Sequence, residues 1–267
     1  MRALLLVCLS GLMLWGPVSE CRADQGVPIL LYHRFGPVVA DSMTVTTPVF
    51  ESHLKYLKDN GYKVIPLREL LDMHAGKGAP SESRCVVLAA DDAHISVYTT
   101  AFPLLKKYNA HMTLFAYPSA VSNASYAMTW DQLRELKATG LCDVQSHTYW
   151  HPNFKKERER LPAGEFEKLV HMQLTKSREK LEKELGARVD LLAWPFGIYD
   201  PWLMARAAEA GYTAAFTIER HAVTREDQPM ALPRYLLADT DRGKTFEAIL
   251  NASHFVAKRE SKNGKSD

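Results

Sequence analysis

Short apolar runs alternate with segments of helical periodicity along most of the chain. The apolar runs are rich in Val, Ile, Leu and Phe, which is typical of buried strands. The segments between them carry apolar residues on one helical face, and most end at glycine or asparagine. The pattern predicts strands at residues 27–35, 62–66, 85–90, 112–117, 141–147, 189–197 and 213–218. It predicts helices at residues 46–60, 67–74, 97–108, 129–139, 164–185 and 201–210.

A sustained strand–helix alternation predicts a parallel sheet covered by helices, either an open doubly wound sheet or a barrel. In such folds, functional polar residues gather at the carboxyl ends of the strands. This chain has His33, the pair Asp91–Asp92, His147 and residues 195–197 at four such ends. We therefore expect these groups to meet at one rim of the sheet.

The adjacent carboxylates Asp91 and Asp92 follow a fully apolar run, so a compensating charge is needed to keep both ionised. His147 and His151 stand four apart, a spacing at which two imidazoles reach one cation from a single helical turn. Alone, such a pair is more often two surface histidines. Together with an aspartate, it predicts an open site for a catalytic divalent cation; zinc suits these donors, and cobalt, nickel or iron also suit imidazole.

The overall charge gives no reason to expect nucleic acid as a partner. The net charge is +2 over 267 residues, and no basic stripe is interleaved with aromatic residues. The length fits one large domain or two small ones, and no linker divides the chain. We predict one domain over residues 24–250 and a polar, disordered tail over residues 251–267.

The first residues have the pattern of a secretory signal, with one early arginine followed by a short apolar core. We predict a signal peptide over residues 1–23, cleaved after Ala23, and a secreted or periplasmic protein with no stable membrane span after cleavage. A signal anchor is the alternative. Lipidation at Cys21 is disfavoured because Glu20 is large and charged.

Cleavage would leave Cys85 and Cys142. An oxidising compartment permits a disulfide between them. Both lie early in predicted core strands, where packed thiols are the simpler expectation.

Several ordered motifs between residues 27 and 237 resemble the polysaccharide deacetylases, that is, carbohydrate esterase family four or NodB-homology domains. The first family motif, Thr-Phe-Asp-Asp-Gly, corresponds to Ala-Ala-Asp-Asp-Ala at residues 89–93. The second, His-Ser/Thr-x-x-His-Pro, is matched in full at residues 147–152. The third, Arg-x-Pro-Tyr-Gly, corresponds to residues 193–197, where alanine replaces the arginine. The resemblance implies a distorted (β/α) barrel of seven or eight mostly parallel strands.

The resemblance also implies roles for the charged residues. Asp91 would be the general base, and Asp92, His147 and His151 the metal ligands. In the family, the arginine of the third motif steadies the base. Arg234, in the later run Leu-Pro-Arg-Tyr, is our candidate to replace it; a surface ion pair is the alternative.

The last family motif, Leu-x-His, usually lies near the C-terminus but here stands at residues 31–33. This order resembles a circularly permuted subgroup that acts on poly-N-acetylglucosamine of biofilm matrices. By that resemblance, His33 is the general acid and Leu31 lines the pocket for the acetyl methyl group. A buried structural histidine is the alternative for His33.

The implied activity is metal-dependent hydrolysis of N-acetyl groups on N-acetylglucosamine units of an exopolysaccharide. The backbone N–H of Phe196 would help to stabilise the tetrahedral oxyanion. Trp150, Trp194 and Pro195 would line the sugar-binding surface, with Trp130 and Tyr149 as further rings; core packing is the alternative for each ring. Any exopolysaccharide synthase or export partner would be a separate chain.

Other functions remain open from the sequence. Peptidoglycan and chitin-type oligomers are alternative substrates, and O-acetyl sugars such as xylan would suit the same chemistry. Alanine at position 93 replaces the family's glycine and would be strained in a left-handed backbone. A non-catalytic carbohydrate-binding protein is therefore a further alternative.

Overall fold

The computed structural model describes residues 26–77 and 84–252 of the chain. The predicted signal peptide and the predicted tail from residue 253 onward lie outside these residues. Residues 251 and 252 continue a helical segment that begins at residue 244. Among the described residues, no helix is long and apolar enough to cross a membrane.

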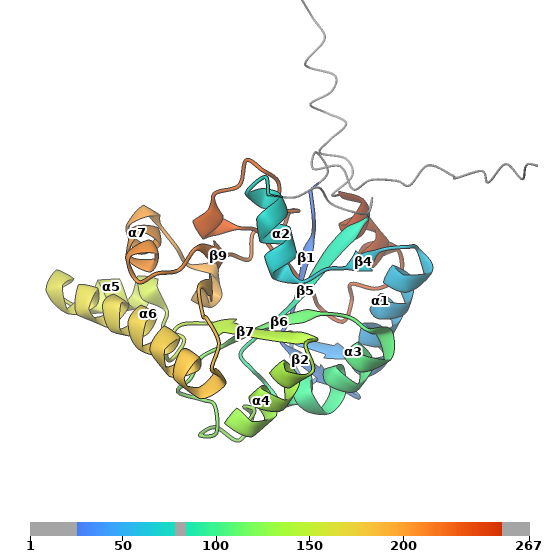
Figure 1. Ribbon diagram of the computed structural model, residues 1–267, viewed down its shortest axis with the longest axis horizontal. Coiled ribbons are helices and arrows are strands. Elements are labelled where there is room, and N and C mark those ends of the chain that lie inside the picture. The colour runs from blue at the N-terminus through green and yellow to red at the C-terminus, as the bar shows by residue number, and fades with distance from the viewer. Residues whose placement is uncertain (1–25, 78–83, 253–267) are drawn as a thin grey trace, which may run out of the picture.

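One curled parallel sheet forms the centre of the molecule (Figure 1). Its strand order is β10-β1-β5-β6-β7-β8-β9, and β4 pairs with β5 beside this path. The small pair β2-β3 stands apart. The strands are β1 (Ile29–Tyr32), β2 (Arg34–Gly36), β3 (Thr44–Thr46), β4 (Lys63–Val64), β5 (Cys85–Asp91), β6 (Met112–Ala116), β7 (Cys142–Ser146), β8 (Leu191–Ala193), β9 (Ala214–Phe216) and β10 (Tyr235–Leu236).

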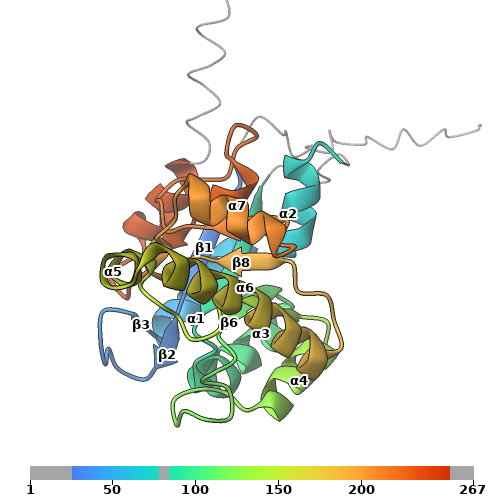
Figure 2. The same cartoon turned by 90° about the vertical axis from the view of Figure 1, so that its left-hand side faces the viewer.

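Helices cover the outside of the sheet, with the long helix α6 and its neighbours α5 and α7 on one side (Figure 2). The helices are α1 (Thr47–Asp59), α2 (Leu67–His74), α3 (Phe102–Tyr108), α4 (Trp130–Ala138), α5 (Phe154–Arg160), α6 (Ala163–Leu185) and α7 (Pro201–Glu209). The short turns are η1 (Val97–Ala101), η2 (Pro195–Gly197) and η3 (Pro229–Ala231). The sequence pattern did not predict α5 or the very short strands β2, β3 and β10, because segments this short show no recognisable hydrophobic periodicity.

The sheet curls into a half-barrel whose open side is spanned by residues 232–236, the closing segment. At its start, Leu232 N–H donates to Ala215 O at 2.8 Å, and Thr217 N–H donates to Leu232 O at 2.8 Å. At its end, β10 pairs in parallel with β1. The predicted distorted barrel is therefore confirmed, with eight strands in its sheet, and the closing segment joins its two edges.

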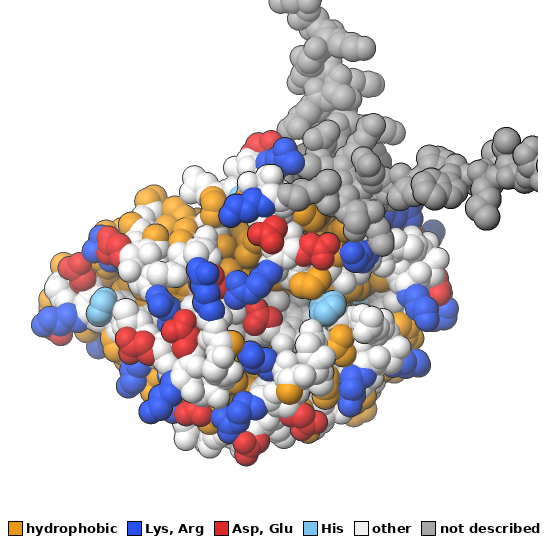
Figure 3. All heavy atoms as spheres, in the orientation of Figure 1, with side chains coloured by type: hydrophobic (Ala, Val, Ile, Leu, Met, Phe, Trp, Pro, Cys, Tyr) orange, Lys and Arg blue, Asp and Glu red, His pale blue; other side chains and the backbone are white. Residues whose placement is uncertain are grey.

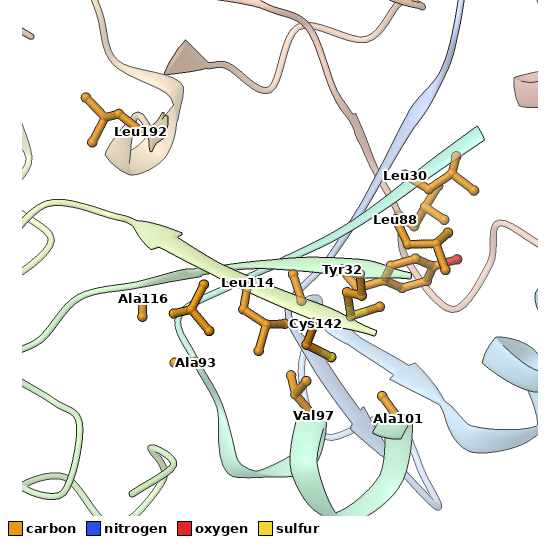
Figure 4. Close-up of a cluster of buried hydrophobic side chains, with 14 of the residues drawn as sticks. Leu30, Tyr32, Leu88, Ala93, Val97, Ala101, Leu114, Ala116, Cys142 and Leu192 are labelled. Atoms are coloured by element: carbon orange, nitrogen blue, oxygen red, sulfur yellow. The ribbon is translucent and has the colours of Figure 1, made fainter. Parts of the chain in front are cut away.

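Two apolar layers follow from the alternation of side chains along each strand. The inner layer fills the half-barrel with residues such as Leu31, Ala89 and Phe115. The outer layer packs the opposite strand faces against the helices, as Leu88, Leu114 and Val97 illustrate in Figure 4. Three strands end at or directly before an acidic or imidazole residue, which are Asp91 for β5, His33 for β1 and His147 for β7. The interior of the half-barrel is therefore apolar below and polar at its rim.

Cys85 and Cys142 are both buried. They lie on β5 and β7, and β6 runs between these strands. Two strand spacings amount to roughly 9–10 Å, which exceeds the ~7 Å Cα separation that a disulfide tolerates. The packed-thiol expectation therefore holds, and burial raises the pKa of Cys142 to about 12.

Candidate metal and catalytic site

Strand register brings the predicted polar groups to one rim. Tyr32 of β1 pairs with Ala90 of β5, so the next residues, His33 and Asp91, lie at the same level at the carboxyl ends of these strands. On the other side of the half-barrel, β7 ends at Ser146, directly before His147. The carboxyl ends of these strands therefore converge, as the sequence predicted.

Asp92, His147 and His151 form a cluster in which the ligand atoms lie within 4.8 Å of one another. His147 Nδ1 donates to the carbonyl oxygen of Ala193 at 2.8 Å. This bond directs Nε2 toward the carboxylates, 3.8 Å from Asp92 Oδ1. Two imidazole nitrogens, one carboxylate and an outer hydrogen bond that orients a ligand are the usual parts of an open site for a divalent cation.

Charges in the cluster suit cation binding. Burial lowers the pKa of His147 to about 3, so its imidazole is neutral and able to ligate. Burial also lowers the pKa of His151. The pKa of Asp92 is raised, first by burial and also by its neighbour Asp91. A cation would remove that cost by pairing directly with the Asp92 carboxylate.

The expectation of a single helical turn between the two histidines is wrong. His147 follows β7, and residues 147–153 form an irregular loop. Thr148 and His151 have φ of 64° and 62°, which turns the chain so that both imidazoles face the same point. The imidazole ring centroids of His147 and His151 are 4.5 Å apart. The four-residue spacing correctly brought the two imidazoles together, but their common direction comes from the left-handed backbone at Thr148 and His151 and not from a helical turn.

Helix α6 holds this loop through two buried polar residues that sequence reasoning missed. Gln173 Oε1 accepts the backbone N–H groups of Tyr149 and Trp150 at 3.0 and 2.9 Å. Ser177 Oγ donates to the Thr148 carbonyl oxygen at 3.0 Å. The available signal was the position of Gln173 and Ser177, four apart on the otherwise apolar face of the helix.

Asp91 is paired with Arg234 rather than placed as a metal ligand. Arg234 Nη1 and Nη2 donate to the two Asp91 oxygens at 2.8 and 2.9 Å, and Nε donates to the Thr217 carbonyl at 2.9 Å. Arg234 is fully buried, so the alternative of a surface ion pair is excluded. Burial would raise the pKa of Asp91, but the charge and hydrogen bonds of Arg234 outweigh it and lower the value to about 2.

His33 lies between these charges, with Nδ1 buried and without a hydrogen-bond partner among the described residues. Burial lowers the pKa of His33, while the carboxylates of Asp91 and Asp92 oppose that shift. A protonated His33 would therefore release its proton more readily than an ordinary imidazolium, while the carboxylates of Asp91 and Asp92 stabilise its charged form.

Backbone strain is concentrated around the site. Asp92 and Ala93 have φ of 73° and 51°, and Phe196 has φ of 56°. Left-handed backbone at these non-glycine positions costs about 1 kcal/mol or more each. Ala93 thus adopts the conformation that the family's glycine would favour, and its methyl group is buried in the outer layer (Figure 4).

The residues expected to contact sugar fall into two groups. Leu31 and Pro195 are buried directly beneath the rim. Trp194 is fully buried, and its Nε1 donates to the Met230 carbonyl at 2.9 Å, so the expectation that its ring faces a sugar is wrong. Trp150 is exposed to 45%. The side chain of Phe196, a residue predicted to act only through its backbone N–H, is exposed to 55%.

Exposed apolar groups gather at the same rim. Within residues 26–77 and 84–252, every large hydrophobic side chain that is exposed lies in a segment that follows the carboxyl end of a sheet strand. These side chains are Val38, Val39, Tyr126, Trp150, Phe196 and Ile218. The face in Figure 3 shows acidic and basic side chains interspersed, with hydrophobic side chains among them. The two other predicted rings, Trp130 and Tyr149, lie under the ammonium groups of Lys180 and Lys176.

Comparison with known proteins identifies the family. The profile described as polysaccharide deacetylase matches residues 78–215, about half of the chain. The chain belongs to the polysaccharide deacetylase family. The matched range contains Asp91, Asp92, His147 and His151, whereas His33 and Arg234 lie on either side of it.

Named relatives and solved deacetylase structures extend this similarity. A putative polysaccharide deacetylase, YxkH of Bacillus subtilis, is 26% identical over 85% of this chain and 76% of its own length. The poly-beta-1,6-N-acetyl-D-glucosamine N-deacetylase of Staphylococcus aureus is 28% identical over 73% of this chain and 68% of its own. The structure of IcaB from Ammonifex degensii superposes with a TM-score of 0.74 at 25% identity, covering 85% of this chain and 98% of that one. The deacetylase PplD of Streptococcus pyogenes shares the fold, with a TM-score of 0.76 at 22% identity over 84% of this chain and 98% of its own.

Proposed function

We propose that this polysaccharide deacetylase is a metal-dependent hydrolase that removes N-acetyl groups from N-acetylglucosamine units of a poly-β-1,6-linked exopolysaccharide. The observation that carries the proposal is the cluster of Asp92, His147 and His151 beside the buried pair of Asp91 and Arg234. The name of the Staphylococcus relative, a poly-beta-1,6-N-acetyl-D-glucosamine N-deacetylase, favours this polymer over chitin or peptidoglycan.

The three clustered side chains would hold a divalent cation, for which zinc is our first choice. Such a cation would polarise the amide carbonyl and make a nearby water more acidic. That contribution matters because a carboxylate whose pKa is about 2 is a weak base by itself.

Asp91 would take the proton from the attacking water. Its bidentate contact with Arg234 fixes the plane of the carboxylate and keeps it ionised, so Arg234 acts as a positioning residue. The backbone N–H of Phe196 would donate to the oxyanion, since its left-handed φ turns this peptide out of the regular strand path. His33 would deliver a proton to the departing sugar amine.

The exposed rim side chains would contact the polymer beyond the reacting unit. Aromatic faces stack on the apolar faces of sugar rings, and Trp150 and Phe196 offer such faces next to the cluster. Leu31, buried under His33, would limit the depth of the acetyl pocket, and Pro195 would support its wall. We also propose a secreted or periplasmic location, with any exopolysaccharide synthase or export protein as a separate partner.

Acetate release from a purified β-1,6-linked N-acetylglucosamine oligomer tests the proposal. We expect turnover that a chelator abolishes and that added divalent metal restores. The variant Asp91→Asn should be inactive while still binding metal, and Glu179→Gln, at an exposed position on α6, should behave as wild type. Faster release from chitin oligomers, peptidoglycan or O-acetylated xylan would reassign the substrate. Oligomer binding that is insensitive to chelator, with no acetate released from any substrate, would establish a carbohydrate-binding protein instead.

A further inference from the structure

Arg34 lies directly after His33, in the small strand pair β2-β3 beside the main sheet (Figure 2). The next residue, Phe35, donates its backbone N–H to Ser96 Oγ at 2.9 Å. This bond fixes β2 against the loop that follows the proposed metal ligand Asp92. The wall of the site next to His33 is therefore formed by a strand whose first side chain is a guanidinium.

A carboxylate outside the catalytic cluster braces this guanidinium. Asp41, in the loop between β2 and β3, forms an ion pair with Arg34 Nη1. Its other oxygen accepts from the Met43 backbone N–H and from Thr44 Oγ1, both at 2.9 Å. Asp41 is thus held by its own loop, and it limits the rotamers available to Arg34. Neither the proposed metal site nor the proposed base, Asp91, requires this ion pair.

The pairing leaves donors on Arg34 unused. The side chain is 39% exposed, and its Nε is buried without a partner among the described residues. The guanidinium is also close enough to the catalytic groups for its charge to oppose protonation of His33 and of Asp92. The exposed part of the guanidinium, rather than the buried Nε, is able to donate to an oxygen of a ligand beside His33.

Resting on the proposed function, we propose that Arg34 is a specificity-determining residue that donates hydrogen bonds to oxygen atoms of the reacting sugar unit. Its charge is balanced by Asp41, so the pair suits neutral hydroxyl and ring oxygens rather than an anionic group. The neutral pair also tolerates a neighbouring unit that has already been deacetylated and carries an ammonium. The planar guanidinium gives these contacts a fixed direction that an ammonium would not provide.

The test compares a sugar substrate with an acetate ester that has no sugar. Wild type, Arg34→Met and Arg34→Lys are assayed for acetate release from the β-1,6-linked N-acetylglucosamine oligomer and for hydrolysis of 4-methylumbelliferyl acetate. We expect Arg34→Met to lose about tenfold to a hundredfold in kcat/KM on the oligomer, mostly through KM, and less than about twofold on the ester. Arg34→Lys should recover only part of the loss.

Matched controls separate this role from folding and from the reaction itself. Arg225→Met, at an exposed arginine near the start of β1, should leave both activities unchanged. Equal losses of Arg34→Met on both substrates would show that its charge serves the reaction and would overturn the proposal, as would no loss on either. If wild type releases no acetate, the proposed function fails. The contact between Arg34 and the sugar is then tested separately by calorimetric titration of the protein with the same oligomer. Weaker binding by Arg34→Met than by wild type supports the contact, and equal binding refutes it.

Discussion

Arg234 and Asp91 stand 143 positions apart in the chain and meet in a buried bidentate pair with N–O distances of 2.8 and 2.9 Å. Arg234 belongs to the closing segment, and Asp91 ends β5, which lies inside the sheet between β1 and β6. The pair therefore ties the closing segment to an inner strand of the sheet. Removing either partner leaves a buried charge with no compensation, which is more costly than removing both.

A double-mutant cycle tests this coupling. We expect Arg234→Met alone to destabilise the fold by about 3–5 kcal/mol, and Asp91→Asn combined with Arg234→Met to recover part of that loss. Arg234→Lys should fold but lose at least about tenfold in turnover, since a lysine cannot hold both carboxylate oxygens. Denaturant unfolding and acetate release measure the two effects. Additive effects on the free energy of unfolding would show that the two residues are not coupled. Near-normal turnover of Arg234→Lys would remove the pair from the mechanism.

Gln173 should control metal affinity without being a ligand. Replacing it with leucine leaves the backbone N–H groups of Tyr149 and Trp150 unsatisfied and releases the loop that carries His151. We expect metal affinity to fall by about tenfold to a hundredfold, measured by competition with a chromogenic chelator. Glu179→Leu, on an exposed position of the same helix, is the control. Unchanged affinity in Gln173→Leu would mean that the loop is held by other contacts.

His53 should make the fold sensitive to mild acid. Its ring is buried, stacks on Phe246, and bonds to Tyr32 Oη and to the Asp241 carbonyl. Burial lowers the pKa of His53 to about 4. Because the unfolded chain binds this proton near pH 6.5, stability is lost as the pH falls from about 6.5 to 4, by at most about 3 kcal/mol.

The variant His53→Gln isolates that contribution. Its unfolding free energy, measured in chelator, should fall less steeply than that of wild type between pH 6.5 and pH 4. His171→Gln, at an exposed histidine of α6, should follow the wild-type slope. A parallel curve for His53→Gln would assign the acid sensitivity to other groups.

Ala93→Gly should be nearly neutral, although it restores the residue that the family motif carries. Glycine relieves a left-handed strain of about 1 kcal/mol, but the buried alanine methyl contributes about 0.8 kcal/mol. We therefore expect a stability change below about 1 kcal/mol and unchanged acetate release. A gain in turnover of tenfold or more would show instead that the alanine limits the enzyme.

Local pattern was sufficient for much of the site. The apolar run before Asp91 and the motif from His147 to His151 identified strand ends and metal-binding donors, because both signals depend on residues that are close in sequence. Arg234 was recognised only as a candidate, since nothing near it in the chain shows which carboxylate it meets. Trp194 was assigned wrongly, because a sequence does not show which side of a strand end faces solvent.

The sequence by itself determined the strand–helix order, the parallel sheet and the residue types that hold a cation, because periodicity and short motifs are local properties of the chain. Only the tertiary structure decided that Gln173 supports the loop between His147 and His151 and that Asp41 pairs with Arg34. It also decided that the closing segment brings the guanidinium of Arg234 to Asp91. These relationships depend on the curl of the sheet and on the packing of helices over it. Both follow from burying many distant side chains at once, which no short stretch of residues encodes.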